Sequence, residues 1–118
     1  MSAPLDPPQL ARFPLETRDA YRRYRATGDA AAAQLIVLSA VREHCPRKIL
    51  LSDDPAQIAS LRLLEDLGYD SLAIAEIIFF LEDLFEVSIR TREIQPIATV
   101  GELRAFVAKK LAEKSLAA

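Results

Sequence analysis

The sequence predicts a small all-α protein. Only three of its 118 residues are glycine, and long stretches are rich in Ala, Leu, Arg and Glu, which favour helices. Apolar residues recur at spacings of three and four, the period of a helix with one buried face. The length corresponds to one domain, and 51% apolar residues can form a core without disulfides or metal. We therefore expect a helical bundle of three long helices and one short helix, with an N-terminal extension.

The composition excludes several classes of partner. The formal net charge is −2, so no general basic field is available to hold nucleic acid or an anionic membrane. The longest apolar run, Ile77–Leu81, is far shorter than the ~20 residues that cross a bilayer. One cysteine, Cys45, and one histidine, His44, exclude an internal disulfide and leave too few ligands for a zinc site. We expect a cytoplasmic monomer without a metal, since the N-terminus also lacks the features of a secretory signal.

Residues 1–28 are interpreted as an N-terminal extension, partly helical or disordered, and residues 29–118 as the main domain. Prolines are frequent in residues 1–15, which should therefore be extended or disordered. A helix fits Thr17 to Thr27, with Thr17 as its cap and Gly28 at its end. The extension carries a charge of +2 and the rest of the chain −4. We expect the extension to dock on its own chain and cover the acidic helix described below; the alternative is a solubilising tail.

The first helix of the main domain should span Ala30 to His44. Asp29 is its expected N-cap, and Leu35, Leu38 and Val41 form an apolar stripe that Ile36 and Val37 widen. Pro46 stops this helix. Residues 46–70 then form a long connection that holds at most one short helical turn.

A helix from Ser71 to about Phe85 should be apolar on two sides. Its core face carries Ile74, Ile77, Ile78, Leu81 and Phe85. No basic residue lies between Arg62 and Arg90, whereas seven acidic residues do. Apolar residues among these acids mark a surface for protein partners. The candidate partner-binding residues are Leu72, Ala75, Glu76, Phe79, Glu82, Asp83 and Glu86.

Residues 86–98 form a second connection, with one short helix around Arg92 to Gln95. The last helix begins after Thr99, because Thr99 and Glu102 make a capping box. Its inward residues should be Val100, Leu103, Phe106, Val107 and Leu111.

The segment Glu65-Asp-Leu-Gly-Tyr-Asp-Ser-Leu72, followed by an acidic helix, resembles the attachment motif of the acyl carrier proteins. The resemblance implies that Ser71 carries phosphopantetheine through a phosphodiester, with Asp70 and Leu72 beside it in the cofactor-binding motif. It also implies that the terminal thiol holds acyl groups as thioesters and that residues 29–118 are the carrier domain. The protein itself would catalyse nothing. Its partners would be a phosphopantetheinyl transferase and the acyl-loading and acyl-using synthase enzymes.

The residues around Ser71 suit this role physically. Gly68 permits a sharp turn before the helix, and Asp70 can cap the helix from the N-cap position. A phosphate ester on Ser71 would meet free backbone N–H groups and the positive end of the helix dipole. Leu72 is either a core residue or a partner contact.

Two other functions remain open, and one is rejected. The chain could be an unmodified helical protein-interaction module, or a peptidyl or aminoacyl carrier, although Asp70 rather than histidine before Ser71 argues against the latter. A serine hydrolase is rejected because Ser71 lacks the Gly-x-Ser-x-Gly context and His44 is the only candidate base.

Several residues depart from the pattern of the family's housekeeping members. Ala73 and Leu84 stand where acids are common, Phe79 and Phe80 are bulkier than usual, and the pI near 5.4 is mild. The departures favour a specialised carrier of lipid or polyketide-like biosynthesis. We expect an acyl chain to enter between the core face of the Ser71–Phe85 helix and the apolar stripes of the first and last helices, with the two aromatics shortening the cavity.

Overall fold

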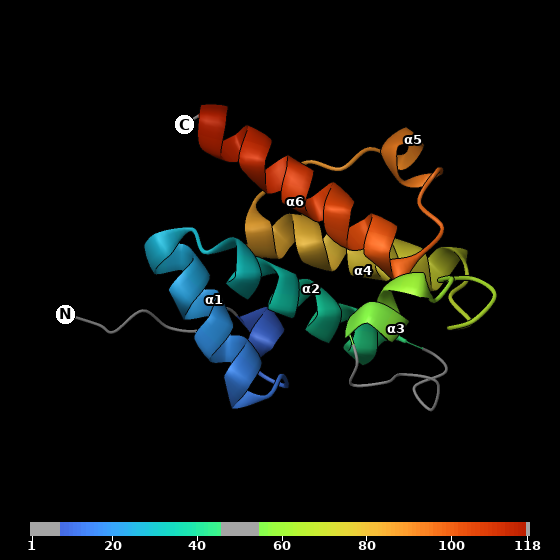
Figure 1. Ribbon diagram of the computed structural model, residues 1–118, viewed down its shortest axis with the longest axis horizontal. Coiled ribbons are helices and arrows are strands. Elements are labelled where there is room, and N and C mark those ends of the chain that lie inside the picture. The colour runs from blue at the N-terminus through green and yellow to red at the C-terminus, as the bar shows by residue number, and fades with distance from the viewer. Residues whose placement is uncertain (1–7, 46–54, 118) are drawn as a thin grey trace.

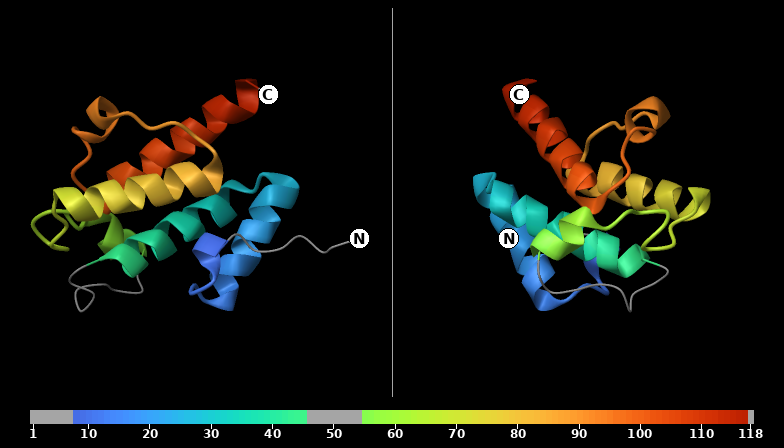
Figure 2. Two further views of the ribbon diagram at one scale, coloured as in Figure 1. Left: turned by 180° about the vertical axis from the view of Figure 1, so that it is seen from behind. Right: turned by 45° about the vertical axis from the view of Figure 1, so that its right-hand side comes forward.

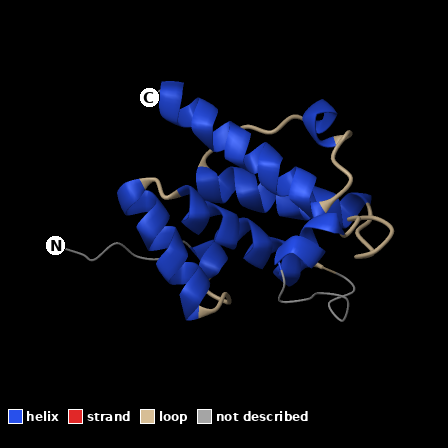
Figure 3. Cartoon of the chain, in the orientation of Figure 1, coloured by secondary structure: helices blue, strands red, loops and turns tan. Residues whose placement is uncertain are grey.

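The computed structural model describes residues 8–45 and 55–117, which form helices and loops without a strand (Figures 1 and 3). The expected all-α bundle is confirmed. The elements are η1 (Pro8–Leu10), α1 (Leu15–Thr27), α2 (Ala30–His44), α3 (Pro55–Ser60), α4 (Ser71–Phe85), α5 (Thr91–Ile94) and α6 (Val100–Ala117). The expected stop at Pro46 lies outside the described residues.

Helix α2 has the predicted bounds and the predicted cap, since the Asp29 side chain accepts a hydrogen bond from the Ala31 N–H at 3.0 Å. Its buried face differs from the expected one, because Leu35 and Leu38 are only partly buried. Helices α1, α4 and α6 all pack against α2, so its centre admits small and branched side chains at close approach. The buried residues are Ala32, Ala33, Ile36, Val37, Ala40 and Val41.

Helices α4 and α6 begin where the sequence predicts. Ile77, Leu81 and Phe85 of α4 are almost fully buried, as expected, whereas Ile74 is only partly buried. At the start of α6 the Thr99 N–H donates to Glu102 Oε1 at 3.0 Å, and the Glu102 N–H donates to Thr99 Oγ1 at 3.1 Å. The predicted capping box is therefore present.

The second half of the long connection is fastened to the start of α6. The Leu63 N–H donates to the Ala98 carbonyl at 2.8 Å, and the Val100 N–H donates to the Leu61 carbonyl at 3.0 Å. Helix α3 packs on α6 at Gly101, where a Cβ would lie 3.0 Å from the Ala59 carbonyl oxygen. These contacts fix the segment that leads into α4.

Residues 8–15 are more ordered than their prolines suggest, whereas residues 1–7 lie outside the described part of the chain. The expectation that Thr17 caps the next helix is wrong. Leu10 is fully buried and Phe13 is 6% exposed, so these two side chains belong to the core, while the other residues of 8–13 are exposed. Thr17 does not cap α1, which begins two residues earlier at Leu15. Instead Thr17 is buried and its hydroxyl lies 2.7 Å from the Ser39 hydroxyl of α2, because α1 packs on α2 along this side.

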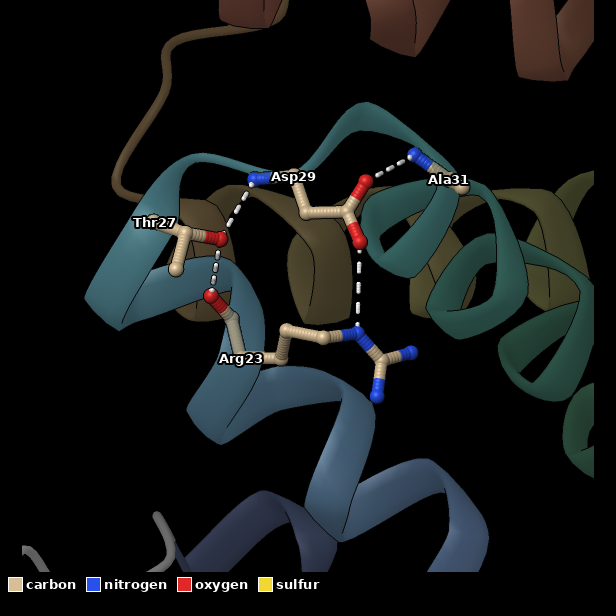
Figure 4. Close-up of polar contacts among 4 residues, drawn as sticks. All are labelled: Arg23, Thr27, Asp29 and Ala31. Atoms are coloured by element: carbon tan, nitrogen blue, oxygen red, sulfur yellow. Dashed lines mark hydrogen bonds and ion pairs between the residues drawn. The ribbon is translucent and has the colours of Figure 1, made fainter.

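Local hydrogen bonds define the corner between α1 and α2 (Figure 4). Gly28 has a positive φ of 74° and its N–H donates to the Tyr24 carbonyl at 2.7 Å, which ends α1 as predicted. The Thr27 hydroxyl donates to the Arg23 carbonyl at 2.8 Å and accepts from the Asp29 N–H at 3.2 Å. Arg23 Nε also donates to Asp29 Oδ2 at 3.2 Å. The corner therefore sets the direction of α1 relative to α2.

Helix α1 and the residues before it reach α4 at the end remote from Ser71. Phe13 stacks on Phe80 with ring centroids 5.4 Å apart, and Tyr24 meets Phe85 edge-on at 5.3 Å. Phe85 lies 14 residues after Ser71, about 21 Å along the helix. Helices α1 and α5 lie on opposite sides of the bundle (Figure 2). Residues 8–28 of the extension thus pack on their own chain and contact the acids of α4 only at its far end, through Arg25 and Glu86. These described residues do not cover the acidic face as expected, since Leu72 and Phe79 stay exposed.

Candidate functional site

The first turn of α4 combines an exposed hydroxyl with a capped helix N-terminus. Gly68 has a φ of 77°, which allows the chain to turn before the helix. Asp70 is extended and its Oδ1 accepts from the Ala73 N–H at 2.8 Å, so it is the N-cap. Ser71 is the first helical residue and is exposed. Helix geometry leaves the N–H groups of Ser71 and Leu72 without intrahelical acceptors, which favours an anion here.

The loop before Ser71 is anchored in the core. Tyr69 is 3% exposed, its N–H donates to the Leu63 carbonyl at 2.9 Å, and its hydroxyl donates to the Val41 carbonyl of α2 at 2.8 Å. Burial raises the pKa of the Tyr69 phenol above its usual value, so this donor keeps its proton. The position of Ser71 relative to α2 is set by this anchor.

The predicted partner surface is exposed at most of its residues. Leu72 is 69% exposed and Phe79 is 65% exposed, so neither is a core residue. Glu76 and Asp83 are exposed as well, and Ala75 is half-buried. Large apolar side chains among acids are therefore presented to solvent along this face of α4.

Two of the predicted partner-binding carboxylates already have contacts within the chain. Glu82 is half-buried, and its Oε2 accepts from the Ile89 N–H at 2.8 Å, which ties the following loop to α4. Glu86 ends α4 in the left-handed region, and its Oε1 accepts from Arg25 of α1 at 2.8 Å. The hydrogen bond from Arg25, with the charge of Lys114 as a second cause, holds the pKa of Glu86 below its usual value. These two side chains have structural contacts that the sequence pattern did not reveal.

A cavity of about 440 Å³ opens beside Ser71, between α4 and α5. Ile74 and Ile78 of the predicted core face line it, but its opposite wall is formed by α5 and the residues beside it rather than by α2 and α6. Ile77, Leu81 and Phe85 of the same face are buried and do not line it. Phe79 lines the cavity but Phe80 does not, since Phe80 packs on Phe13. The residues that sequence reasoning missed are Leu64, Ile89, Thr91, Ile94, Gln95 and Ile97. Isoleucine recurs in residues 86–98, which the sequence analysis treats as a connection, and this recurrence could have indicated an apolar wall there.

His44 is not placed to act on Ser71. Its Nδ1 lies 2.9 Å from the Ala40 carbonyl oxygen, and its ring lies 5.3 Å from the Phe80 ring. Phe80 comes nine residues after Ser71, about 14 Å along α4. No catalytic pair is formed by these two residues.

Packing explains three of the four residues that depart from the housekeeping pattern. Ala73 and Leu84 are 8% and 2% exposed, so a charged side chain at either position would be buried. Phe80 stacks on Phe13, a residue that the extension supplies. Phe79 is the fourth, and it faces solvent at the cavity.

Comparison with known proteins agrees with this geometry. Residues 50–107, which include α4 and the cavity, match the family model described as a phosphopantetheine attachment site. The chain is 37% identical over 62 residues to an acyl carrier protein of Exiguobacterium sp.. The matched segment covers 52% of this chain and 78% of that protein. It is 39% identical over 61 residues to the acyl carrier protein of Amoebophilus asiaticus, covering 51% of this chain and 76% of that protein. No solved structure matches the chain significantly.

The fold and the attachment domain define a carrier with a covalently attached phosphopantetheine group. The chain belongs to the acyl carrier protein family, whose members carry acyl groups and are not enzymes. Members of this family work with a phosphopantetheinyl transferase and with synthases. Within residues 8–45 and 55–117, no helix has the length and apolarity that crossing a membrane requires.

Proposed function

We propose that Ser71 bears the phosphopantetheine arm and that the arm holds acyl groups as thioesters for enzymes of lipid or polyketide-like biosynthesis. The observation that carries the proposal is the position of Ser71, exposed at the first turn of α4 behind the Asp70 cap. When bound, the group supplies a thiol at the end of a long, mobile arm. In its attachment, the Ser71 oxygen forms a bond to the phosphorus of coenzyme A that bears the pantetheine. The bond from that phosphorus to the bridging oxygen of the diphosphate breaks, adenosine 3′,5′-bisphosphate leaves with the bridging oxygen, and the serine hydroxyl gives up its proton.

The residues around Ser71 fit this group. A phosphodiester on Ser71 would meet the N–H groups of Ser71 and Leu72 and the positive end of the α4 dipole. The Asp70 carboxylate accepts a hydrogen bond from the Ala73 N–H, so the backbone of the first turn of α4 stabilises its negative charge. Leu72 is exposed beside the ester and is available to a partner enzyme.

The proposed partner surface is the exposed face of α4. Leu72, Ala75 and Phe79 offer apolar contact, and Glu76 and Asp83 offer negative charge to basic patches on partner enzymes. Glu82 and Glu86 remain in the proposed surface but contribute less, because each already has a partner within the chain.

The cavity between α4 and α5 is the proposed site for the acyl chain. Its volume lies within the ~300–1,000 Å³ typical of small-molecule sites, and Ser71 lies at its margin. Ile74, Ile78, Ile94 and Ile97 offer it an apolar lining. Phe79 at this cavity and the packed extension support a specialised pathway over the housekeeping one. The cytoplasmic location and the monomeric state remain predictions from sequence.

The decisive experiment compares Ser71→Ala with the wild type after coexpression with a broad-specificity transferase. We expect intact-mass spectrometry to show a phosphopantetheine adduct on the wild type and none on the variant, because only the hydroxyl oxygen can form the ester. Ser88→Ala is the matched control, since Ser88 is also exposed and should leave modification intact. An adduct on the alanine variant would reject Ser71 as the site. An unmodified wild type would favour the unmodified interaction module.

A further inference from the structure

The wall of the cavity that α5 forms is held with little packing. No side chain of α5 is buried, although Thr91 and Ile94 line the cavity opposite α4. Within α5 the bonds are local: the Glu93 N–H donates to the Arg90 carbonyl at 2.9 Å, and the Gln95 N–H donates to the Thr91 carbonyl at 3.2 Å. Core packing of α5 is limited to the partly buried Ile94, and the hydrogen bond from the Ile89 N–H to Glu82 holds only the loop before α5. A polar contact between α5 and another helix can therefore add to what fixes the distance between α5 and α4.

Glu93 uses its two carboxylate oxygens for two different tasks. Oε1 accepts from the Arg90 N–H at 2.9 Å and caps α5, while Oε2 pairs with Lys110 Nζ of α6 at 2.7 Å. The side chains of Glu93 and Lys110 are 29% and 19% exposed, so this pair is better shielded than the surface pair of Arg22 and Asp19 at 46% and 53%. Lys110 also lies 5.7 Å from the centre of the Phe106 ring, which holds it on the face of α6.

We propose that Glu93 and Lys110 are positioning residues that hold α5 at its distance from α4 and so set the length of the acyl chain that the cavity admits. The proposal rests on the proposed attachment at Ser71 and on the acyl site beside it. Without the pair, the loops on either side of α5 allow this wall to move away from α4. A short acyl chain then loses its contact with the α5 side of the cavity, while a longer chain gains room.

Conservative variants can remove the pair while keeping the helix cap. Glu93→Gln retains an oxygen for the Arg90 N–H but loses the charge that attracts Lys110. Lys110→Met loses the charge and keeps most of the side-chain stem, whereas Lys110→Arg keeps the pair. Asp19→Asn is the matched control, because it breaks the surface pair with Arg22 on α1, on the opposite side of the bundle.

The test measures melting temperatures of the pantetheine-bearing protein and of its butanoyl, octanoyl and dodecanoyl forms. In Glu93→Gln and Lys110→Met we expect the gain from the butanoyl and octanoyl chains to fall by about half or more, with a smaller loss for the dodecanoyl chain. The double variant Glu93→Gln with Lys110→Met should show the same reduced gain in melting temperature as either single variant. Lys110→Arg and Asp19→Asn should keep the wild-type gains.

A purely structural pair would lower all melting temperatures equally and leave the gains unchanged, and that result would overturn the proposal. Amide hydrogen exchange on the unmodified chain gives an independent reading. Residues 91–97 should exchange faster in Glu93→Gln than in the wild type, while α6 is unchanged. If Glu93→Gln exchanges faster at residues 91–97 but the wild type takes no adduct at Ser71, the proposed function is rejected, while Glu93 and Lys110 still hold α5 in place. Unchanged exchange, in a chain that is modified and stabilised by acylation, would reject the positioning role alone.

Discussion

Glu102 shows how one carboxylate can fasten the start of a helix. Its Oε1 accepts from the N–H groups of Ala98 and Thr99 at 2.9 and 3.0 Å, just before α6. The pKa of the Glu102 carboxyl is lowered from its usual 4.5, first by the hydrogen bond from the Ala98 N–H and then by the one from the Thr99 N–H. Both hydrogen bonds favour the charged form of the carboxyl. The unfolded chain lacks these bonds, so folding and ionisation of Glu102 are linked.

This linkage predicts how stability depends on pH. The stabilisation from ionised Glu102 is complete above the unfolded pKa near 4.5 and is lost as the pH falls through the lower folded pKa. We expect Glu102→Gln to be less stable than the wild type at neutral pH and to approach it in acid. Urea unfolding of both proteins from about pH 7 down to about pH 3 measures this difference. A difference that stays constant over the whole range would contradict the assignment.

Helix α4 separates its two apolar sides into a core and a surface. Its buried side packs in the bundle, and its exposed side places Leu72 and Phe79 near Glu76 and Asp83. Glu76 and Asp83 are exposed at the surface, so we expect them to attract basic partner enzymes over a distance rather than through one fixed salt bridge. Attraction of this kind weakens as salt is added.

Reversing two of these charges should therefore slow modification without unfolding the protein. We expect Glu76→Lys with Asp83→Lys to lower the rate of modification by an added transferase about tenfold at low ionic strength. The melting temperature should change little because both side chains are exposed. Glu16→Lys with Glu113→Lys makes the same change in net charge at two other exposed positions and should leave the rate nearly intact. Equal rates in all three proteins would remove this face as the transferase surface.

The whole molecule is larger than the segment that matches the family, because the extension completes its core. Leu10, Phe13, Thr17 and Ala20 are all buried, and Tyr24 meets Phe85 at the end of α4. Burying Leu10 and Phe13 alone contributes about 3–6 kcal/mol by transfer from water, out of a total stability of ~5–15 kcal/mol. The extension is thus a structural element.

Removal of residues 1–28 should lower the melting temperature and shift the amide resonances of α2 and of the end of α4. Phe13→Ala tests the same contact with one substitution and should cost about 3–5 kcal/mol, as expected for a buried phenylalanine. Leu15→Ala is the control, since Leu15 is 59% exposed and should have little effect. Unchanged melting temperature and unchanged shifts from Ala30 onward after the deletion would show that the extension is not part of the fold.

Features that depend on neighbouring residues along the chain were predictable. Asp29, Asp70 and the pair Thr99 and Glu102 mark three helix starts, since a cap needs a side chain within three residues of the N–H that it satisfies. The interpretation of Ser71 also rests on a local segment, from Glu65 to Leu72. The bounds of α2 and α4 follow from the same short-range periodicity.

Features that depend on distant residues could not be read from the pattern. Thr17 looks like a cap but meets Ser39, Phe80 looks like a cavity residue but meets Phe13, and the cavity opens toward α5 rather than toward α2. The amino-acid sequence alone therefore established the all-α class, the starts of the long helices and the attachment motif, because these arise within a few residues of chain. Only the tertiary structure decided where the extension packs, which groups Glu82 and Glu86 bind and which residues line the cavity. Each of these needs side chains from segments that only packing brings together.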